Sequence, residues 1–283
     1  AQPHPMVQRN HRAEALKRFA TGTLLHTLLS GWDYAWFDSS VLYASGPAPS
    51  IDISAPDYHQ PVSLPGNPLA DQDNLTQRSG LYLQDQIELQ RWRLSAGIRR
   101  DWVHVRNSDN LSDSNRRTSD SATTYQLGAL YLFDNGLAPY ASYAESFLPQ
   151  SGTNANGPLK PTEGTQYEIG LKYQPPGSSA LFTASLYHLT QQNVSTRDPL
   201  DPLNTVQTGE QVSRGLELEA VADLSERLHL NASYSYNDPE VTRSNDGNEG
   251  KEPKDTPRHM AALWLDYNLP SGLGFGAGAR YTG

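Results

Sequence analysis

The chain has 283 residues, with 22 lysines and arginines against 31 aspartates and glutamates, and it contains no cysteine. The net charge of -9 argues against a nucleic-acid surface, and the absence of cysteine excludes a disulfide framework, a cysteine-ligated zinc cluster and a thiol nucleophile. No run of the sequence approaches the ~18 apolar residues that a transmembrane helix needs.

Apolar and polar residues alternate along most of the chain, which is the period of a β-strand, whereas long helical periodicity is missing. We therefore predict an all-β sheet of roughly a dozen strands. In chain order the predicted strands cover Ala13–Ala20, Leu24–Tyr43, Ser79–Leu89, Arg93–Val105, Thr124–Phe133, Ala138–Phe147, Thr165–Tyr173, Ala180–Thr190, Val212–Ala222, Leu228–Asn237, His259–Leu269 and Gly274–Thr282.

The connections between these strands are short and long in turn. Tight turns are expected near residues 21–22, 90–92, 134–136, 175–178, 225–227 and 270–272. Long polar segments are expected at 44–78, 106–123, 148–164, 195–211 and 238–258. This alternation is typical of an up-and-down meander whose two ends lie in different compartments. A Greek-key sandwich has no reason to alternate so regularly.

The segment 213–236 shows how the two faces of the predicted sheet differ. Leu216 and Leu218 share one face, and Glu217 and Glu219 share the other. Ionised groups in a dry core would each need a buried partner, whereas in a hydrated lumen they cost little. We therefore predict that the leucines face lipid. The predicted lumen-lining residues are Glu168, Lys172, Glu217, Glu219, Asp266 and Arg280.

These features favour an antiparallel up-and-down transmembrane β-barrel with short periplasmic turns and long extracellular loops. Most of the predicted strands run to about 9–11 residues, as a tilted membrane strand requires. Tyrosines at strand ends suit the aromatic girdle of such a barrel; they are Tyr131, Tyr173, Tyr234, Tyr236, Tyr267 and Tyr281. A soluble β-sheet that exposes its charged face to bulk water remains an alternative.

Several longer strings resemble, in order, consecutive barrel strands of TonB-dependent outer-membrane siderophore receptors. The resemblance is greatest to the ferrichrome and ferrioxamine (hydroxamate) branch, and it runs from about Phe19 to Gly283. The strings include GLYLQDQIEL, YLFDNGLAPYASYAESFLPQSG, LKPTEGTQYEIGLKY, SRGLELEAVADLSERLHLNASYSYND and TPRHMAALWLDY.

The resemblance implies energy-coupled import of a ferric hydroxamate siderophore across the bacterial outer membrane, by a receptor and not by an enzyme. In this family a 22-stranded barrel holds an N-terminal plug, and the ligand binds between the extracellular loops and the apex of the plug. The implied partners are the ferric siderophore, the TonB–ExbB–ExbD complex, which acts through an N-terminal segment, and outer-membrane lipid with lipopolysaccharide. No cofactor and no nucleic-acid partner are implied, and the complete receptor is expected to be a monomer.

The resemblance also sets an expectation about domains. Residues 1–283 correspond to part of the receptor barrel domain, without the plug, the TonB-contacting segment or the final barrel strands. Both end strands would then be unpaired edges, which do not persist in lipid and invite aggregation in water. We therefore expect the segment alone neither to transport nor to fold stably.

Candidate ligand residues lie on or after the strand that leads to the first long loop. A hydroxamate siderophore wraps its iron completely, so that a receptor needs aromatic walls and hydrogen-bond donors rather than metal ligands. The candidates are Tyr43, Tyr58, His59 and Trp36. Trp36 also suits a lipid-interface anchor. The sequence offers no catalytic residues and no metal-ligand spacing, since Glu217 and Glu219 are accompanied by no nucleophile or metal-site motif.

Two other functions are compatible with parts of this pattern. A passive outer-membrane porin would have an apolar exterior but no plug, and a plug-encoding sequence upstream would eliminate it. A soluble β-rich binding or adhesion module would bury Leu216, Leu218, Ile169 and Leu171 under a second layer.

Overall fold

The computed structural model describes residues 6–63, 66–150, 153–154, 157–198, 200, 205–253 and 256–283. Twelve strands form one antiparallel sheet whose spatial order follows the chain, and β7 (Thr153–Asn154) pairs separately with β8 (Gly157–Pro158). The strands of the large sheet are β1 (Val7–Thr21), β2 (Leu24–Tyr43), β3 (Ala70–Leu89), β4 (Trp92–Asp109), β5 (Ser114–Tyr131), β6 (Leu137–Leu148), β9 (Thr162–Tyr173), β10 (Leu181–Arg197), β11 (Thr205–Ser225), β12 (Leu228–Arg243), β13 (His259–Asn268) and β14 (Gly274–Thr282).

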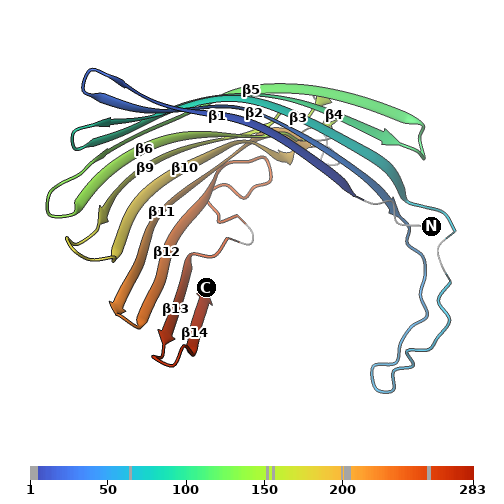
Figure 1. The fold of residues 1–283 in the computed structure, drawn as a ribbon. Coiled ribbons are helices and arrows are strands. Elements are labelled where there is room, and N and C mark those ends of the chain that lie inside the picture. The colour runs from blue at the N-terminus through green and yellow to red at the C-terminus, as the bar shows by residue number, and fades with distance from the viewer. Residues whose placement is uncertain are drawn as a thin grey trace.

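The sheet is an up-and-down meander, which confirms the predicted fold class. Figure 1 shows it as an arch, with β1 at one edge and β14 at the other. The arch has a convex face and a concave face. None of the described residues form a helix that is long and apolar enough to cross a membrane.

Every predicted strand is present, and β2 and β14 match their predicted bounds to the residue. Most of the others are longer than predicted, and β11 reaches 21 residues. The physical reason lies in the outer parts of the strands, where polar residues such as Asp73 and Ser108 still pair directly. Alternation of hydrophobicity requires one face in lipid and the other in water, so it fades where both faces are wet, although the backbone pairing continues.

The predicted connection 106–123 is wrong for the same reason. The segment 106–123 was expected to be a long polar connection, but β4 and β5 continue through it and leave a turn of residues 110–113. Asp113 in this turn has φ 50°, a left-handed conformation that suits aspartate and asparagine in turns. The other predicted turns separate the strands as expected. The predicted long connections 44–78, 195–211 and 238–258 are shorter than expected, because β3, β10, β11 and β12 extend into them.

The apolar face of the sheet is exposed rather than packed against protein. Ile169 is 60% exposed and Leu218 is 40% exposed, and both lie on the convex face. The buried apolar side chains among the described residues are small, namely valines and alanines. The described residues therefore do not show the second layer that a soluble module would need over these leucines.

Aromatic side chains lie towards both ends of this apolar face. Tyr173 and Phe182 stack near the short turns, with ring centroids 6.4 Å apart, and Tyr143 and Tyr167 meet nearer the outer end at 5.1 Å. Two aromatic bands that flank an apolar band are typical of an outer-membrane barrel, where they lie at the two lipid–water interfaces.

Candidate functional site

The strand register brings the predicted lumen residues to one face of the sheet. A single row of direct partners crosses six strands, from β9 to β14, and residues directly opposite each other in an antiparallel pair share a face. The row consists of Lys172, Thr183, Glu219, Ser233, Ala262 and Arg280. Glu168, Glu217 and Asp266 lie an even number of residues from members of this row on continuous strands, so all six predicted residues share the face.

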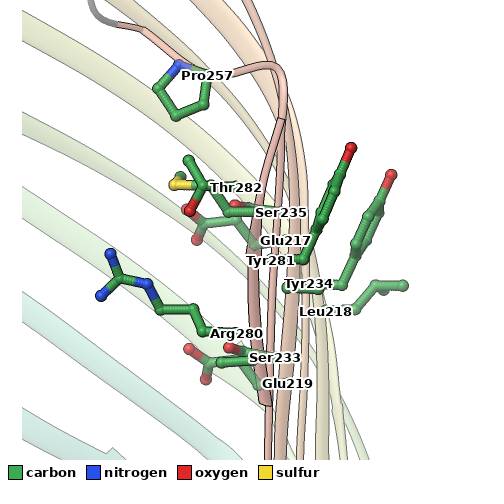
Figure 2. A pocket seen from close by; sticks show the side chains of 13 residues that line it. Glu217, Leu218, Glu219, Ser233, Tyr234, Ser235, Pro257, Arg280, Tyr281 and Thr282 are labelled. Atoms are coloured by element: carbon green, nitrogen blue, oxygen red, sulfur yellow. The ribbon is translucent and has the colours of Figure 1, made fainter.

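Figure 2 shows this division from close by. Glu217, Glu219 and Arg280 point to the concave side of the arch, and Tyr234 and Tyr281 point to the convex side. Both glutamates are exposed, and among the described residues none of the six predicted lumen residues forms an ion pair. The concave face over β9–β14 is therefore a polar surface on which the carboxylates of Glu217 and Glu219 are exposed.

Glu168 is the one predicted lumen carboxylate that a tyrosine holds in place. The hydroxyl of Tyr140 donates to its Oε1 at 2.6 Å, and Gln166 Nε2 donates to its Oε2 at 3.1 Å. The ammonium of Lys172 lies 5.5 Å from the centroid of the Tyr140 ring, a distance that permits a cation–π contact. Tyr140 thus connects an acid and a base on the concave face.

A second charged cluster, on β2–β4, was not predicted from the sequence. Arg99 donates to both oxygens of Asp33, at 2.7 and 2.9 Å, and to both oxygens of Asp101, each at 2.7 Å. Arg78 Nε donates to Asp101 as well, at 2.9 Å. Asp101 is 2% exposed, so its charge depends on these two guanidinium groups. Gly80 leaves the necessary space, since a Cβ there would lie 2.0 Å from Arg99 Nη2.

Only part of this cluster could be predicted from the sequence. Arg99 and Asp101 are two residues apart on one strand, so alternation alone places them on the same face. Their partners come from β2 and β3, and nothing in the sequence fixes the register that brings those strands alongside.

A contact between a tyrosine ring and a glycine recurs on the concave face. In three places a tyrosine ring lies over the glycine directly opposite it on the neighbouring strand. The tyrosine hydroxyl then donates a hydrogen bond to a polar side chain near that glycine or on the following strand, namely Glu14, Glu168 or Asn237. The pairs are Tyr82 over Gly31, Tyr140 over Gly170 and Tyr187 over Gly215. Glycine permits this because it has no side chain to hold the ring away from the sheet.

Gly31→Ala is expected to destabilise the folded protein by about 1–3 kcal/mol, the usual cost of overpacking. The new Cβ would lie 2.3 Å from the Tyr82 ring, and displacement of the ring would break its hydrogen bond to Glu14, which is 2.5 Å long. Gly97→Ala is the matched control, because there the nearest atom would be 3.7 Å from the Cβ. Each variant is expressed from the protein's own gene, and outer membranes are isolated. A folded barrel migrates faster on a gel than the unfolded chain, so the measurement is the temperature at which this faster band disappears. Equal temperatures for the two variants would contradict the argument.

The four predicted ligand residues do not come together. Trp36 lies on the convex face, where the guanidinium of Arg9 is 5.5 Å from its ring centroid. Tyr43 ends β2, and its side chain is 56% exposed. Tyr58, which is 78% exposed, and His59 lie in the loop 44–69. Loop, strand end and convex face are therefore three separate locations, and ligand contact by these residues stays a prediction.

The outer part of the concave face holds a cavity that the sequence did not indicate. It has a volume of about 540 Å³, within the range of small-molecule sites. Its centre is a row of direct partners across β2–β5, namely Ser39, Asn74, Asn107 and Arg116. The side chain of Phe37 and the buried Val105 form its apolar part. Asn74, Asn107 and Arg116 were missed because 44–78 and 106–123 were expected to be loops.

Two oxygens on this outer part of the face are buried without a hydrogen-bond partner among the described residues. They are Oδ1 of Asn107, in the cavity, and Oδ2 of Asp120, on β5. Burial raises the pKa of Asp120 above its ordinary value, since desolvation penalises the charged carboxylate. Buried oxygens of this kind are rare in folded proteins and call for an explanation, such as a ligand or water.

Comparison with known proteins identifies the family to which the chain belongs. The family described as "TonB dependent receptor-like, beta-barrel" matches residues 7–283. The ferrioxamine B receptor of Salmonella typhimurium strain SL1344 is 38% identical over 271 residues, which cover 93% of this chain and 38% of the receptor. The ferrichrome outer membrane transporter/phage receptor of Escherichia coli K12 is 36% identical over 285 residues, covering 94% of this chain and 37% of the transporter.

A solved structure shows the same fold. The closed form of the ferric-catecholate import receptor Fiu of Escherichia coli K12 superposes with a TM-score of 0.79 and 23% identity, over 98% of this chain and 44% of that one. The chain thus spans less than half of the length of each of these three proteins.

Proposed function

Since the chain belongs to the TonB-dependent receptor β-barrel family, we propose that it forms part of the barrel wall of an outer-membrane receptor. We propose that this receptor takes up ferric hydroxamate siderophores in a TonB-dependent way. The observation that carries the proposal is the identity of 36–38% to a ferrioxamine B receptor and a ferrichrome transporter over more than nine tenths of the chain.

The two faces of the sheet support this role. In the outer membrane, the convex face with Ile169 and Leu218 meets lipid and lipopolysaccharide, and the concave face with Glu168, Glu217 and Glu219 lines a hydrated lumen. Tyr43, Tyr58 and His59 lie towards the extracellular end, where they remain candidates for ligand contact. Trp36 instead anchors the barrel at the lipid interface, since it lies on the convex face beside Arg9.

The ferric siderophore is the cargo, and the TonB–ExbB–ExbD complex supplies the energy for import. No catalytic step is part of the proposal. A passive porin would have the same lipid-facing exterior, so dependence of uptake on TonB is the property that separates the two functions.

The test is growth and radioactive iron uptake by an iron-starved strain that lacks its own hydroxamate receptors and carries the gene for this protein. We expect uptake from ferrioxamine B or ferrichrome that is lost when TonB is deleted, and no uptake from ferric citrate. Uptake that persists without TonB would support a porin, and an absence of uptake from every hydroxamate would contradict the proposal.

A further inference from the structure

The cavity on the outer part of the concave face has the chemistry of a binding site. Gln72, Asn74 and Asn107 project amide groups into it from β3 and β4, and Ser39 adds a hydroxyl from β2. Each side-chain amide has a donor end and an acceptor end, and each hydroxyl can act in both ways. The lining therefore suits a ligand that itself displays both N–H groups and carbonyl oxygens.

The unpartnered oxygen of Asn107 points to the same kind of ligand. A buried acceptor without a partner costs about 1–3 kcal/mol, and a ligand N–H would remove that cost. Phe37 and Val105 offer an apolar surface next to the amides, against which methylene groups of a ligand can pack.

The charges at the cavity favour a ligand whose iron centre is neutral. The one carboxylate in the lining, Asp109, already accepts hydrogen bonds from the backbone N–H groups of Leu111 and Ser112, at 2.9 and 3.3 Å, in the turn between β4 and β5. Arg116 is the one cation in the lining. Three hydroxamates neutralise iron(III), whereas three catecholates leave it trianionic, and a single arginine that shares the lining with an aspartate is a poor counter-charge for such an anion.

We propose that this cavity, centred on Asn74 and Asn107, binds the amide and hydroxamate groups of the ferric siderophore before import. The inference rests on the proposed function and adds to it a location on this chain and a preference for hydroxamates over catecholates. The cavity lies on paired strands and not on loops, so it is formed before the ligand arrives.

The test measures binding of ferrioxamine B and ferrichrome to whole cells that carry the gene for this protein and lack TonB, so that transport does not contribute. Asn74→Ala and Asn107→Ala are each expected to weaken binding about tenfold. Asn74→Asp keeps the shape of the side chain but removes its donor, and we expect it to weaken binding at an unchanged amount of receptor in the outer membrane. Gln77→Ala is the matched control on the same strand, since Gln77 lies on the convex face and donates to Tyr34. The control is expected to bind as the unmodified protein does.

The outcomes separate this inference from the proposed function. Unchanged binding by the three asparagine variants, with hydroxamate binding by the unmodified protein, would overturn the cavity and leave the function intact. Equal losses in the asparagine variants and in Gln77→Ala would also overturn the cavity, because they would indicate a general effect on folding. Failure of the unmodified protein to bind any hydroxamate would overturn both.

Discussion

Leu218→Lys is expected to destabilise the protein in the outer membrane by about 2–4 kcal/mol, the cost of a lysine near the middle of the lipid-facing side of a barrel. Leu218 lies on the convex face, directly opposite Tyr234 and Ala184, and is 40% exposed. In lipid that exposure is favourable for leucine, whereas an ammonium group there is separated from water on every side.

The matched variant is Ser233→Lys, which places the same residue on the concave face. Ser233 is exposed and lies directly opposite Glu219, so a lysine there gains a carboxylate neighbour in a hydrated place. We expect almost no loss of stability. The measurement compares the amount of folded protein in the outer membrane and its unfolding temperature for the two variants. A larger loss for Ser233→Lys than for Leu218→Lys would mean that the faces are assigned the wrong way round.

Arg99→Ala is expected to cost about 3 kcal/mol of stability, because it removes one partner of a buried ion pair. Four hydrogen bonds to Asp33 and Asp101 would be lost, and Asp101, at 2% exposed, would keep Arg78 as its one guanidinium partner among the described residues. The loss falls on three neighbouring strands, β2, β3 and β4, so their outer halves are expected to separate first.

Arg100→Ala is the control for this variant. Arg100 is the next residue on β4, lies on the opposite face and donates to the hydroxyls of Thr123 and Ser121, at 2.8 and 2.7 Å, in an exposed position. Its removal is expected to cost less than about 1 kcal/mol. The measurement compares the unfolding temperatures of the two variants in isolated outer membranes. A similar temperature for both would show that the Arg99 cluster contributes little to the stability of the folded protein.

Prediction from the sequence succeeded for the parts of the strands between lipid and lumen, and failed for the outer parts of the strands. Within the membrane one face is apolar and the other polar, so alternation located β2 and β14 to the residue and assigned Glu217 and Leu218 to opposite faces. Beyond the membrane the alternation disappears, although the hydrogen-bonded ladder continues. The outer halves of β3, β4 and β5 therefore resembled loops, and the cavity around Asn74 and Asn107 was invisible.

Register is the second limit. Alternation gives the face of each residue but not its neighbours on other strands, so the contacts of Arg99 with Asp33 and of Tyr82 with Gly31 could not be derived. The candidates Tyr43, Tyr58 and His59 were chosen by residue type near an expected loop, a criterion that carries no information about which residues meet in space.

The long outer parts of β2–β5 make the cavity independent of the segment that connects β2 to β3. The ladder that holds Asn74 and Asn107 keeps its geometry when the connecting segment 44–69 is lengthened, shortened or replaced. Sequence changes can therefore accumulate in that segment without altering the arrangement of the side chains that line the cavity.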